Sequence, residues 1–275
     1  MGTILVVANE TLAGADLFKT IKEKAGADSR IVLCVPRKNP KHGNVIYDDA
    51  VIDAAKVRID LMRRFMREEG LDAIGEIGDP DPYTATVDAD AEYDPDEIIV
   101  STYPAQASGW MRRDLIERIT AATGKPVTHI EQDIDAVGLP FDVTLVVAAK
   151  TASGDDLLEH LKAKAQGGEK SLFIVLVPQE GANASAAARA RARMSQVVDR
   201  LGAANLLAAG MTGDPDPYTA ILNANNLFRV DDIVISTLPA TRSGWLRADL
   251  ITRVRKATGK PVDHVEAPET NKATV

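Results

Sequence analysis

Two stretches of this sequence are near copies of one another, and they decide the fold. Residues 78–131 read GDPDPYTATVDADAEYDPDEIIVSTYPAQASGWMRRDLIERITAATGKPVTHIE, and residues 213–266 read GDPDPYTAILNANNLFRVDDIVISTLPATRSGWLRADLITRVRKATGKPVDHVE. About thirty of about 54 aligned positions are identical, far more than chance gives over so long a period. Looser matches precede them, between residues 4–14 and 144–154 and between residues 31–36 and 173–178. A repeat of this length is a whole domain, so the chain holds one domain twice.

The composition is that of an ordinary globular protein. The 275 residues are 45% hydrophobic and 26% charged, with a formal net charge of -8. These values exclude collagen, coiled-coil and disordered classes and allow about two domains that each bury a core. The acidic balance argues against broad nucleic-acid binding, which needs basic surfaces. We therefore expect no nucleic-acid partner.

Cysteine content and apolar runs indicate the compartment. Cys34 is the single cysteine, so an intramolecular disulfide is excluded and a reducing environment is favoured. No apolar run reaches the roughly 18 residues that a membrane span needs. The first apolar run follows no basic stretch, which is untypical of a signal peptide. We expect a cytoplasmic protein without a membrane partner.

Short Val/Ile runs alternate with helical patterns in both copies. This alternation predicts βαβ units and a parallel sheet. Runs such as residues 98–100 are continuously apolar, as sheets covered on both faces require. The last helix of each copy is predicted over residues 109–122 and 244–257. The predicted domain bounds are 1–133 for copy one, 134–141 for a linker, 142–268 for copy two and 269–275 for a polar tail.

The order of motifs resembles that of the universal stress protein family. In copy two, Gly213-Asp214-Pro215 precedes a helix with Ala220-Ile221-Leu222, and Lys260-Pro261-Val262 precedes the last strand, as Lys125-Pro126-Val127 does in copy one. The resemblance implies an α/β fold of two tandem doubly wound, flavodoxin-like sheets with five parallel strands in the order 3-2-1-4-5. It also implies a pseudo-dimer in which the two copies pair through their last strands, further homo-oligomers, and a stress-response binding or regulatory role with an unknown protein partner.

The glycine motif of the family's nucleotide-binding members is missing here. Those members carry an Asp after the first strand, which is Asn9 or Ala149 in this chain. After the fourth strand they carry Gly, two residues, Gly, nine residues, Gly and Ser/Thr. The matching positions hold Val100, Tyr103, Arg113 and Asp114 in copy one and Ile235, Leu238, Ala248 and Asp249 in copy two. Side chains there keep backbone amides from phosphate, and a carboxylate repels it. ATP binding with weak hydrolysis is one alternative function, and a scaffold without a ligand is another.

Polar residues at the strand exits form a candidate site for a small anion or a nucleotide-like molecule. In doubly wound sheets, ligands bind outside the carboxyl ends where strand order reverses. A helix N-terminus there favours an anion, an arginine adds a charged contact, and a tryptophan offers a stacking surface. The candidate residues are Asn9, Glu10, Thr11, Ser101, Thr102, Ser108, Gly109, Trp110 and Arg112 in copy one and Ser236, Thr237, Ser243, Gly244, Trp245 and Arg247 in copy two. The sequence assigns no catalytic residue, no metal and no obligatory cofactor.

A purely structural interpretation covers the same positions. It takes Ser108 and Ser243 as helix caps, Trp110 and Trp245 as packing anchors, and Asp114–Arg118 and Asp249–Arg253 as helix-surface ion pairs. Both interpretations remain open.

Two further features have two interpretations each, and Cys34 has one. Asp81 and Asp216 suit helix caps before proline, whereas Asp79 with Asp81 suits Mg²⁺. The pairs His129/Glu131 and His264/Glu266 suit cross-strand contacts between the copies or a shared metal site. Cys34 suits a buried small hydrophobe.

Overall fold

The computed structural model describes residues 2–26, 28–37, 48–104, 114–152, 154–167, 170–181, 183–239, 243–247 and 249–267, without the side chains of residues 48, 49, 246 and 247. Packing contacts divide the chain into unit 1, Met1–Pro140, and unit 2, Phe141–Val275. The division lies within the segment predicted as a linker. That segment contains the short helix α5 (Ile134–Val137), which the Asp133 side chain caps.

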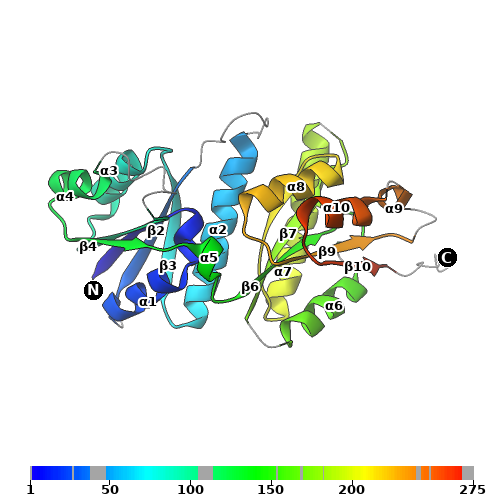
Figure 1. The fold of residues 1–275 in the computed structure, drawn as a ribbon, viewed down its shortest axis with the longest axis horizontal. Helices are drawn as coiled ribbons and strands as arrows, with labels where there is room; N and C mark the ends of the chain where they lie inside the picture. Colours follow the sequence, from blue (N-terminus) through cyan, green and yellow to red (C-terminus); the bar gives the residue numbers. More distant parts are fainter. Residues whose placement is uncertain are drawn as a thin grey trace. The chain divides into compact units, whose positions relative to one another are not determined.

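Unit 1 contains a five-stranded parallel sheet of order β3-β2-β1-β4-β5, which confirms the predicted 3-2-1-4-5 order (Figure 1). Its strands are β1 (Thr3–Val7), β2 (Arg30–Pro36), β3 (Asp72–Gly78), β4 (Glu97–Thr102) and β5 (Val127–Glu131). The helical elements between them are η1 (Glu10–Ala13), α1 (Ala15–Lys24), α2 (Asp48–Glu68), α3 (Pro82–Tyr93) and α4 (Leu115–Thr123). The strand order reverses between β1 and β4, which pair directly.

Unit 2 repeats this order as β8-β7-β6-β9-β10. Its strands are β6 (Asp142–Val147), β7 (Ser171–Pro178), β8 (Leu207–Gly213), β9 (Asp232–Thr237) and β10 (Val262–Glu266). Its helices are α6 (Asp155–Ala165), α7 (Ala184–Ala203), α8 (Pro217–Leu227), α9 (Gly244–Arg247) and α10 (Leu250–Thr258). The reversal lies between β6 and β9.

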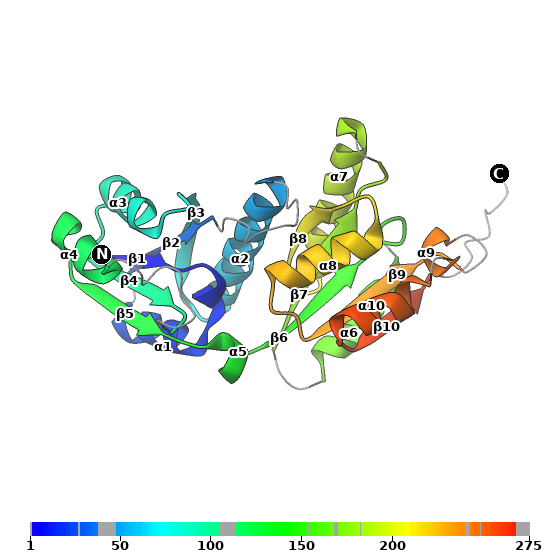
Figure 2. The ribbon, with the colours of Figure 1, turned by 45° about the horizontal axis from the view of Figure 1, so that its top comes forward.

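Helices cover both faces of each sheet (Figures 1 and 2). In unit 2, Leu157 of α6 and Val197 of α7 pack with Phe173 in one core layer, while α8 and α10 pack against each other. In unit 1, Ala85 of α3 and Ile119 of α4 pack in the corresponding second layer. Burial on both faces explains why the central strands are apolar at every position.

The repeated Gly-Asp-Pro motif joins a strand to a closely packed helix. A Cβ on Gly213 would lie 2.7 Å from Cβ of Ala220 and 2.8 Å from Cδ1 of Leu176. The glycine is therefore required by the close approach of α8 to the sheet. The aspartate three residues after this glycine caps the helix, since the Asp216 carboxylate accepts hydrogen bonds from the Thr219 amide and hydroxyl. Asp81 caps α3 in the same way, which confirms the turn interpretation.

Cys34 is a buried core residue, as predicted. Its side chain is fully buried in β2, and its Sγ atom lies 3.7 Å from the carbonyl oxygen of Ala85. Burial raises the pKa of the thiol well above its usual value, and the Glu76 carboxylate adds to the effect. The thiol is therefore a poor nucleophile in the folded protein.

The prediction of one continuous helix over residues 244–257 is wrong. The structure has the four-residue α9 and then α10, separated around Asp249, whose φ of 52° is left-handed. Aspartate adopts this conformation more readily than most residues, so no glycine was needed to mark the break. In unit 1, Asp114 also has a left-handed φ of 47° before α4. The start predicted at residue 109 lies outside the described residues.

Candidate ligand-binding site

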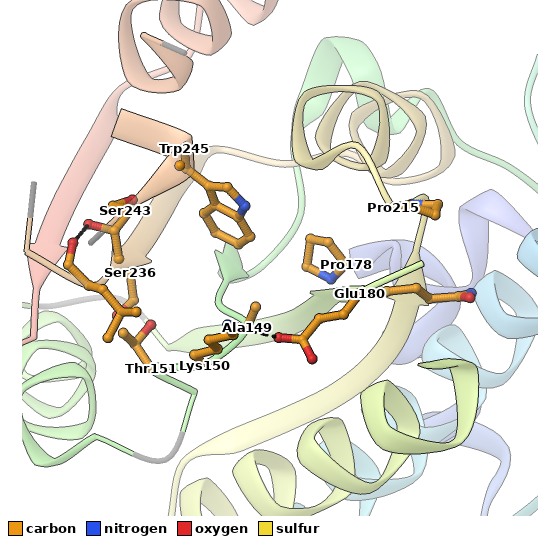
Figure 3. Close-up of a pocket in the computed structure, with 13 residues that line it drawn as sticks. Ala149, Lys150, Thr151, Pro178, Glu180, Pro215, Ser236, Ser243 and Trp245 are labelled. Atoms are coloured by element: carbon orange, nitrogen blue, oxygen red, sulfur yellow. Dashed lines mark hydrogen bonds and ion pairs between the residues drawn. The ribbon is translucent and has the colours of Figure 1, made fainter. Parts of the chain in front are cut away.

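A pocket of about 280 Å³ opens at the carboxyl ends of β6, β7 and β9 in unit 2 (Figure 3). This is the point where the strand order reverses, the place where doubly wound sheets bind ligands. Its lining residues are Ala149, Lys150, Thr151, Pro178, Gln179, Glu180, Pro215, Ser236, Thr237, Leu238, Ser243, Gly244 and Trp245.

The structure brings together most of the site residues predicted in copy two. Ser236, Thr237, Ser243, Gly244 and Trp245 all line the pocket. The side chain of the sixth, Arg247, is not among those described. The argument from a helix N-terminus does not hold, because α9 has four residues and is too short to build a useful dipole.

Two buried hydroxyl groups lie on one side of the pocket. Thr151 is 5% exposed, and its Oγ1 is buried without a hydrogen-bond partner in the described part of the chain. Ser236, at the end of β9, is 2% exposed. Figure 3 shows both side chains on the side of the pocket away from Pro178. A buried polar atom of this kind normally bonds to water or to a ligand, and because Thr151 lines the pocket its hydroxyl is placed to do so.

The other side of the pocket carries an apolar surface and a small charged cluster. The partly buried indole of Trp245 and the rings of Pro178 and Pro215 supply the apolar part. The Glu180 carboxylate lies 3.8 Å from Nζ of Lys150 and 3.2 Å from Nη1 of Arg193. One anion between two cations leaves a local excess of one positive charge.

Sequence reasoning missed several members of this site. Lys150, Thr151, Pro178 and Glu180 come from the half of unit 2 in which the two copies differ most. The available signal was their position directly after β6 and β7, the strands next to the reversal.

The histidines of the last strands are bound within their own units. The Thr102 hydroxyl and Nε2 of His129 are 2.9 Å apart, and those of Thr237 and His264 are 2.8 Å apart. The Thr237 hydroxyl also donates to the carbonyl of Leu238, so it accepts from His264. Among the described residues, no group of three or more His, Cys, Asp or Glu side chains is placed to bind a metal.

The corresponding crevice of unit 1 is occupied by its own side chains. The amide nitrogen Nε2 of Gln132 donates to the carbonyl of Thr11 at 2.7 Å and to Oγ of Ser101 at 2.8 Å. The Thr11 hydroxyl donates to the carbonyl of Ser101 at 3.0 Å, and the Asn9 amide donates to the carbonyl of Pro36 at 2.6 Å. The predicted residues Thr11 and Ser101 therefore contact each other and Gln132, and Asn9 contacts the backbone of Pro36.

The remaining candidates of copy one are charged or undescribed. The Glu10 carboxylate lies close enough to Arg58 and Tyr103 to raise the pKa of each, although burial lowers that of Arg58 overall. Burial, the Glu10 carboxylate and the side chain of Asp135 raise the pKa of Tyr103. Thr102 is bound to its histidine, as described above. The predicted residues Ser108, Gly109, Trp110 and Arg112 lie outside the described residues.

The predicted ion pairs on the last helices are not formed. The guanidinium of Arg118 lies 4.0 Å from the ring centre of Tyr83, and that of Arg253 lies 4.1 Å from the ring centre of Tyr218. Because Asp114 and Asp249 precede their helices in a left-handed conformation, their carboxylates are not on the helix face that the i, i+4 rule assumes. The arginines instead join the last helix of each unit to the helix beside it.

The two units define a tandem doubly wound α/β protein with a candidate ligand site at the reversal point of unit 2. No protein-family model and no curated protein matches the chain. Similar solved structures include a universal stress protein from Archaeoglobus fulgidus DSM 4304, with 17% identity, coverage of 98% of this chain and 97% of that chain, and a TM-score of 0.35. A universal stress protein family protein from Arabidopsis thaliana with AMP bound has 15% identity and a TM-score of 0.32. The match covers 50% of this chain and 95% of that chain.

A functionally unknown protein from Pseudomonas aeruginosa PAO1 has 18% identity, covers 97% of this chain and 93% of that chain, and has a TM-score of 0.32. Universal stress proteins are thus among the solved structures similar to this chain, as the sequence resemblance predicted. Matches of this identity and TM-score carry no argument about ligand or activity. In the described part of the chain, no helix is long and apolar enough to cross a membrane.

Proposed function

We propose that this chain is a ligand-binding regulatory protein resembling the universal stress proteins, and that unit 2 binds one small molecule in its pocket. The observation that carries the proposal is the buried Thr151 hydroxyl, which lines the pocket and has no hydrogen-bond partner among the residues that the structure describes. An unpaired buried polar group costs about 1–3 kcal/mol. A bound molecule that hydrogen-bonds to it removes this cost, so the site is more favourable when occupied.

The lining indicates the kind of ligand. A volume of about 280 Å³ is near the lower end of the roughly 300–1,000 Å³ typical of small-molecule sites. The indole of Trp245 offers an aromatic face for a ring. The cluster of Lys150, Glu180 and Arg193 favours a neutral ligand or one with a single negative charge. A small ring compound with polar substituents fits all three features.

A nucleoside triphosphate is a weaker candidate for this pocket. The positions at which the family's nucleotide-binding members have phosphate-binding glycines hold residues with side chains here. Asp249 adds an exposed carboxylate at the start of the last helix. Its charge opposes a polyphosphate. An adenine-nucleotide-binding protein and a scaffold without a ligand are therefore treated as outcomes of the test. A role in a stress response is what the resemblance implies, and it forms part of the proposal.

Mass spectrometry of small molecules released from natively purified protein tests the proposal. We expect one compound in near-equal amount to the chain, and its loss from a Trp245→Ala variant. A matched control is Trp110→Ala, the other tryptophan of the chain, which should retain the compound. Release of ATP would favour the nucleotide alternative. No released compound, together with no binder from a small-molecule screen by thermal shift, would favour the scaffold.

We also propose that the copies pair through their last strands, as the resemblance implies. The strands β5 and β10 are edge strands of their sheets, and an edge strand can pair with another. Sedimentation of the isolated segment 1–140 tests this idea. A dimer is expected, whereas a stable monomer contradicts the pairing.

A further inference from the structure

Gln132 and Ala267 occupy equivalent places in the two units. Gln132 directly follows β5, and its backbone N–H donates to the carbonyl of Thr102 at 3.0 Å. Ala267 directly follows β10, and its amide nitrogen donates to the carbonyl of Thr237 at 2.9 Å. The backbone therefore takes the same course, and only the side chain differs.

The Gln132 side chain fills a defined space in unit 1. It is 7% exposed, and its Nε2 donates to the carbonyl of Thr11 and to Oγ of Ser101. A Cβ placed on Gly14 would overlap its amide group. The space therefore lies beside Gly14, Thr11 and Ser101, and a primary amide occupies it.

Among the described residues, no side chain fills the matching space in unit 2. A Cβ placed on Gly154, the equivalent of Gly14, would have one protein atom of the described chain within 4 Å, the carbonyl oxygen of Thr151 at 3.2 Å. The residues equivalent to Thr11 and Ser101 are Thr151 and Ser236, and both line the pocket. The acceptors that bind an amide in unit 1 thus border an open space in unit 2.

Resting on the proposed function, we infer that the unit 2 pocket recognises a ligand carrying a primary amide or a similar neutral N–H donor, which takes the place that Gln132 fills in unit 1. The donor binds the carbonyl of Thr151 and Oγ of Ser236. The rest of the ligand lies under the indole of Trp245, which Figure 3 shows facing the same pocket. Unit 1 is closed by its own amide, so the chain has one site of this kind among its described residues.

The inference also explains why the copies differ after their last strand. In unit 1 the amide is covalently attached, so it closes the crevice permanently at no cost of association. In unit 2 the alanine leaves the donor to be supplied by a molecule from solution. A site built to bind an N–H group discriminates strongly against an analogue that lacks it, because its acceptors are then left without a partner.

Benzamide and acetophenone test the ligand class directly. The two molecules have nearly the same shape, and a methyl group of acetophenone replaces the amide nitrogen of benzamide. Binding is measured by fluorescence of Trp245 in a full-length Trp110→Phe chain. We expect benzamide to bind at least about tenfold more tightly, as two hydrogen bonds predict. Equal affinity of the two compounds would overturn the inference while leaving the pocket, and hence the proposed function, intact.

Two variants at position 267 complete the test. Ala267→Gln should place an amide on Thr151 and Ser236 and abolish benzamide binding, whereas Ala267→Ser should retain it. Circular dichroism and the unfolding temperature show whether each variant is folded. Undiminished benzamide binding by a folded Ala267→Gln chain would show that the space is not the amide site and would overturn the inference. Binding of neither compound would also count against it, and the co-purification experiment then judges the proposed function separately.

Discussion

The same substitution at two equivalent threonines should change stability in opposite directions. Thr11 in unit 1 uses its hydroxyl to donate to the carbonyl of Ser101 at 3.0 Å. Thr151 in unit 2 has a buried hydroxyl oxygen for which the described part of the chain supplies no partner. Valine has nearly the same shape as threonine, so the two Thr→Val changes mainly remove the hydroxyl. The comparison therefore isolates what each hydroxyl contributes.

The magnitudes follow from the hydrogen bonds. Thr11→Val loses one hydrogen bond and should lower the free energy of unfolding by about 0.5–1.5 kcal/mol. Thr151→Val removes an unsatisfied buried group, whose burial costs about 1–3 kcal/mol, and should raise the free energy of unfolding of the ligand-free protein. The two variants should differ by about 1.5–4.5 kcal/mol in the free energy of unfolding. Thr151→Val should at the same time weaken ligand binding, because the ligand loses its hydroxyl partner.

Urea unfolding of dialysed full-length protein measures both changes. Hydrogen-exchange mass spectrometry assigns each change to its unit, since it follows peptides of unit 1 and unit 2 separately. A loss of stability in Thr151→Val that matches the loss in Thr11→Val would refute the reasoning. It would mean that the Thr151 hydroxyl is already satisfied in the ligand-free protein.

Three further predictions concern charge, packing and nucleotide. Burial raises the pKa of Asp232 despite the Lys164 ammonium 3.1 Å away. The folded state then holds this proton more tightly than the unfolded chain does, so the contribution of Asp232 to the free energy of unfolding falls as pH rises above about 4. Asp232→Asn should remove that slope in urea titrations, and an unchanged slope contradicts the assignment. Gly213→Ala should lower the free energy of unfolding, measured by urea titration, by about 1–3 kcal/mol, because the added methyl group overpacks α8 against the sheet. Gly26→Ala is the control and should change this free energy little, since its Cβ would have a single atom nearby, 3.8 Å away. Equal effects of the two substitutions would show that α8 shifts to accommodate the methyl group. Millimolar ATP with Mg²⁺ should leave the unfolding temperature unchanged, and a clear rise would restore the nucleotide alternative.

The sheet architecture was predictable because the physical signals for it are local and repeated. Continuous apolar runs such as residues 31–35 require burial on both faces, and alternation with helices requires parallel strands. The cap at Asp216 and the proline after it also act locally. The duplication showed each signal twice, whereas the strand order 3-2-1-4-5 was implied by the resemblance to the universal stress protein family and is found in both units.

The break in the last helix was not predictable from local signals. Asp249 has an ordinary helix-compatible neighbourhood in the sequence, and its left-handed backbone directly precedes α10. The error carried over to the predicted ion pair with Arg253, whose guanidinium lies over Tyr218 instead. Both outcomes depend on tertiary packing, which sequence periodicity does not encode.

The candidate site was only half predictable. Ser236 and Trp245 lie in the well-repeated half, and their position after a central strand identified them. Lys150 and Glu180 lie in the divergent half, and the contact between them depends on how two separate loops meet. The exchange of Gln132 for Ala267 is visible in the aligned sequences, but its meaning depends on the path of a side chain across the crevice.

The number of small molecules bound per chain shows whether unit 2 alone has an open amide site. Native mass spectrometry of the full-length protein with saturating benzamide counts them one by one. We expect one bound molecule per chain, and none in Ala267→Gln. Two molecules per chain would show that Gln132 does not close unit 1, and one molecule that persists in Ala267→Gln would show that the site lies elsewhere.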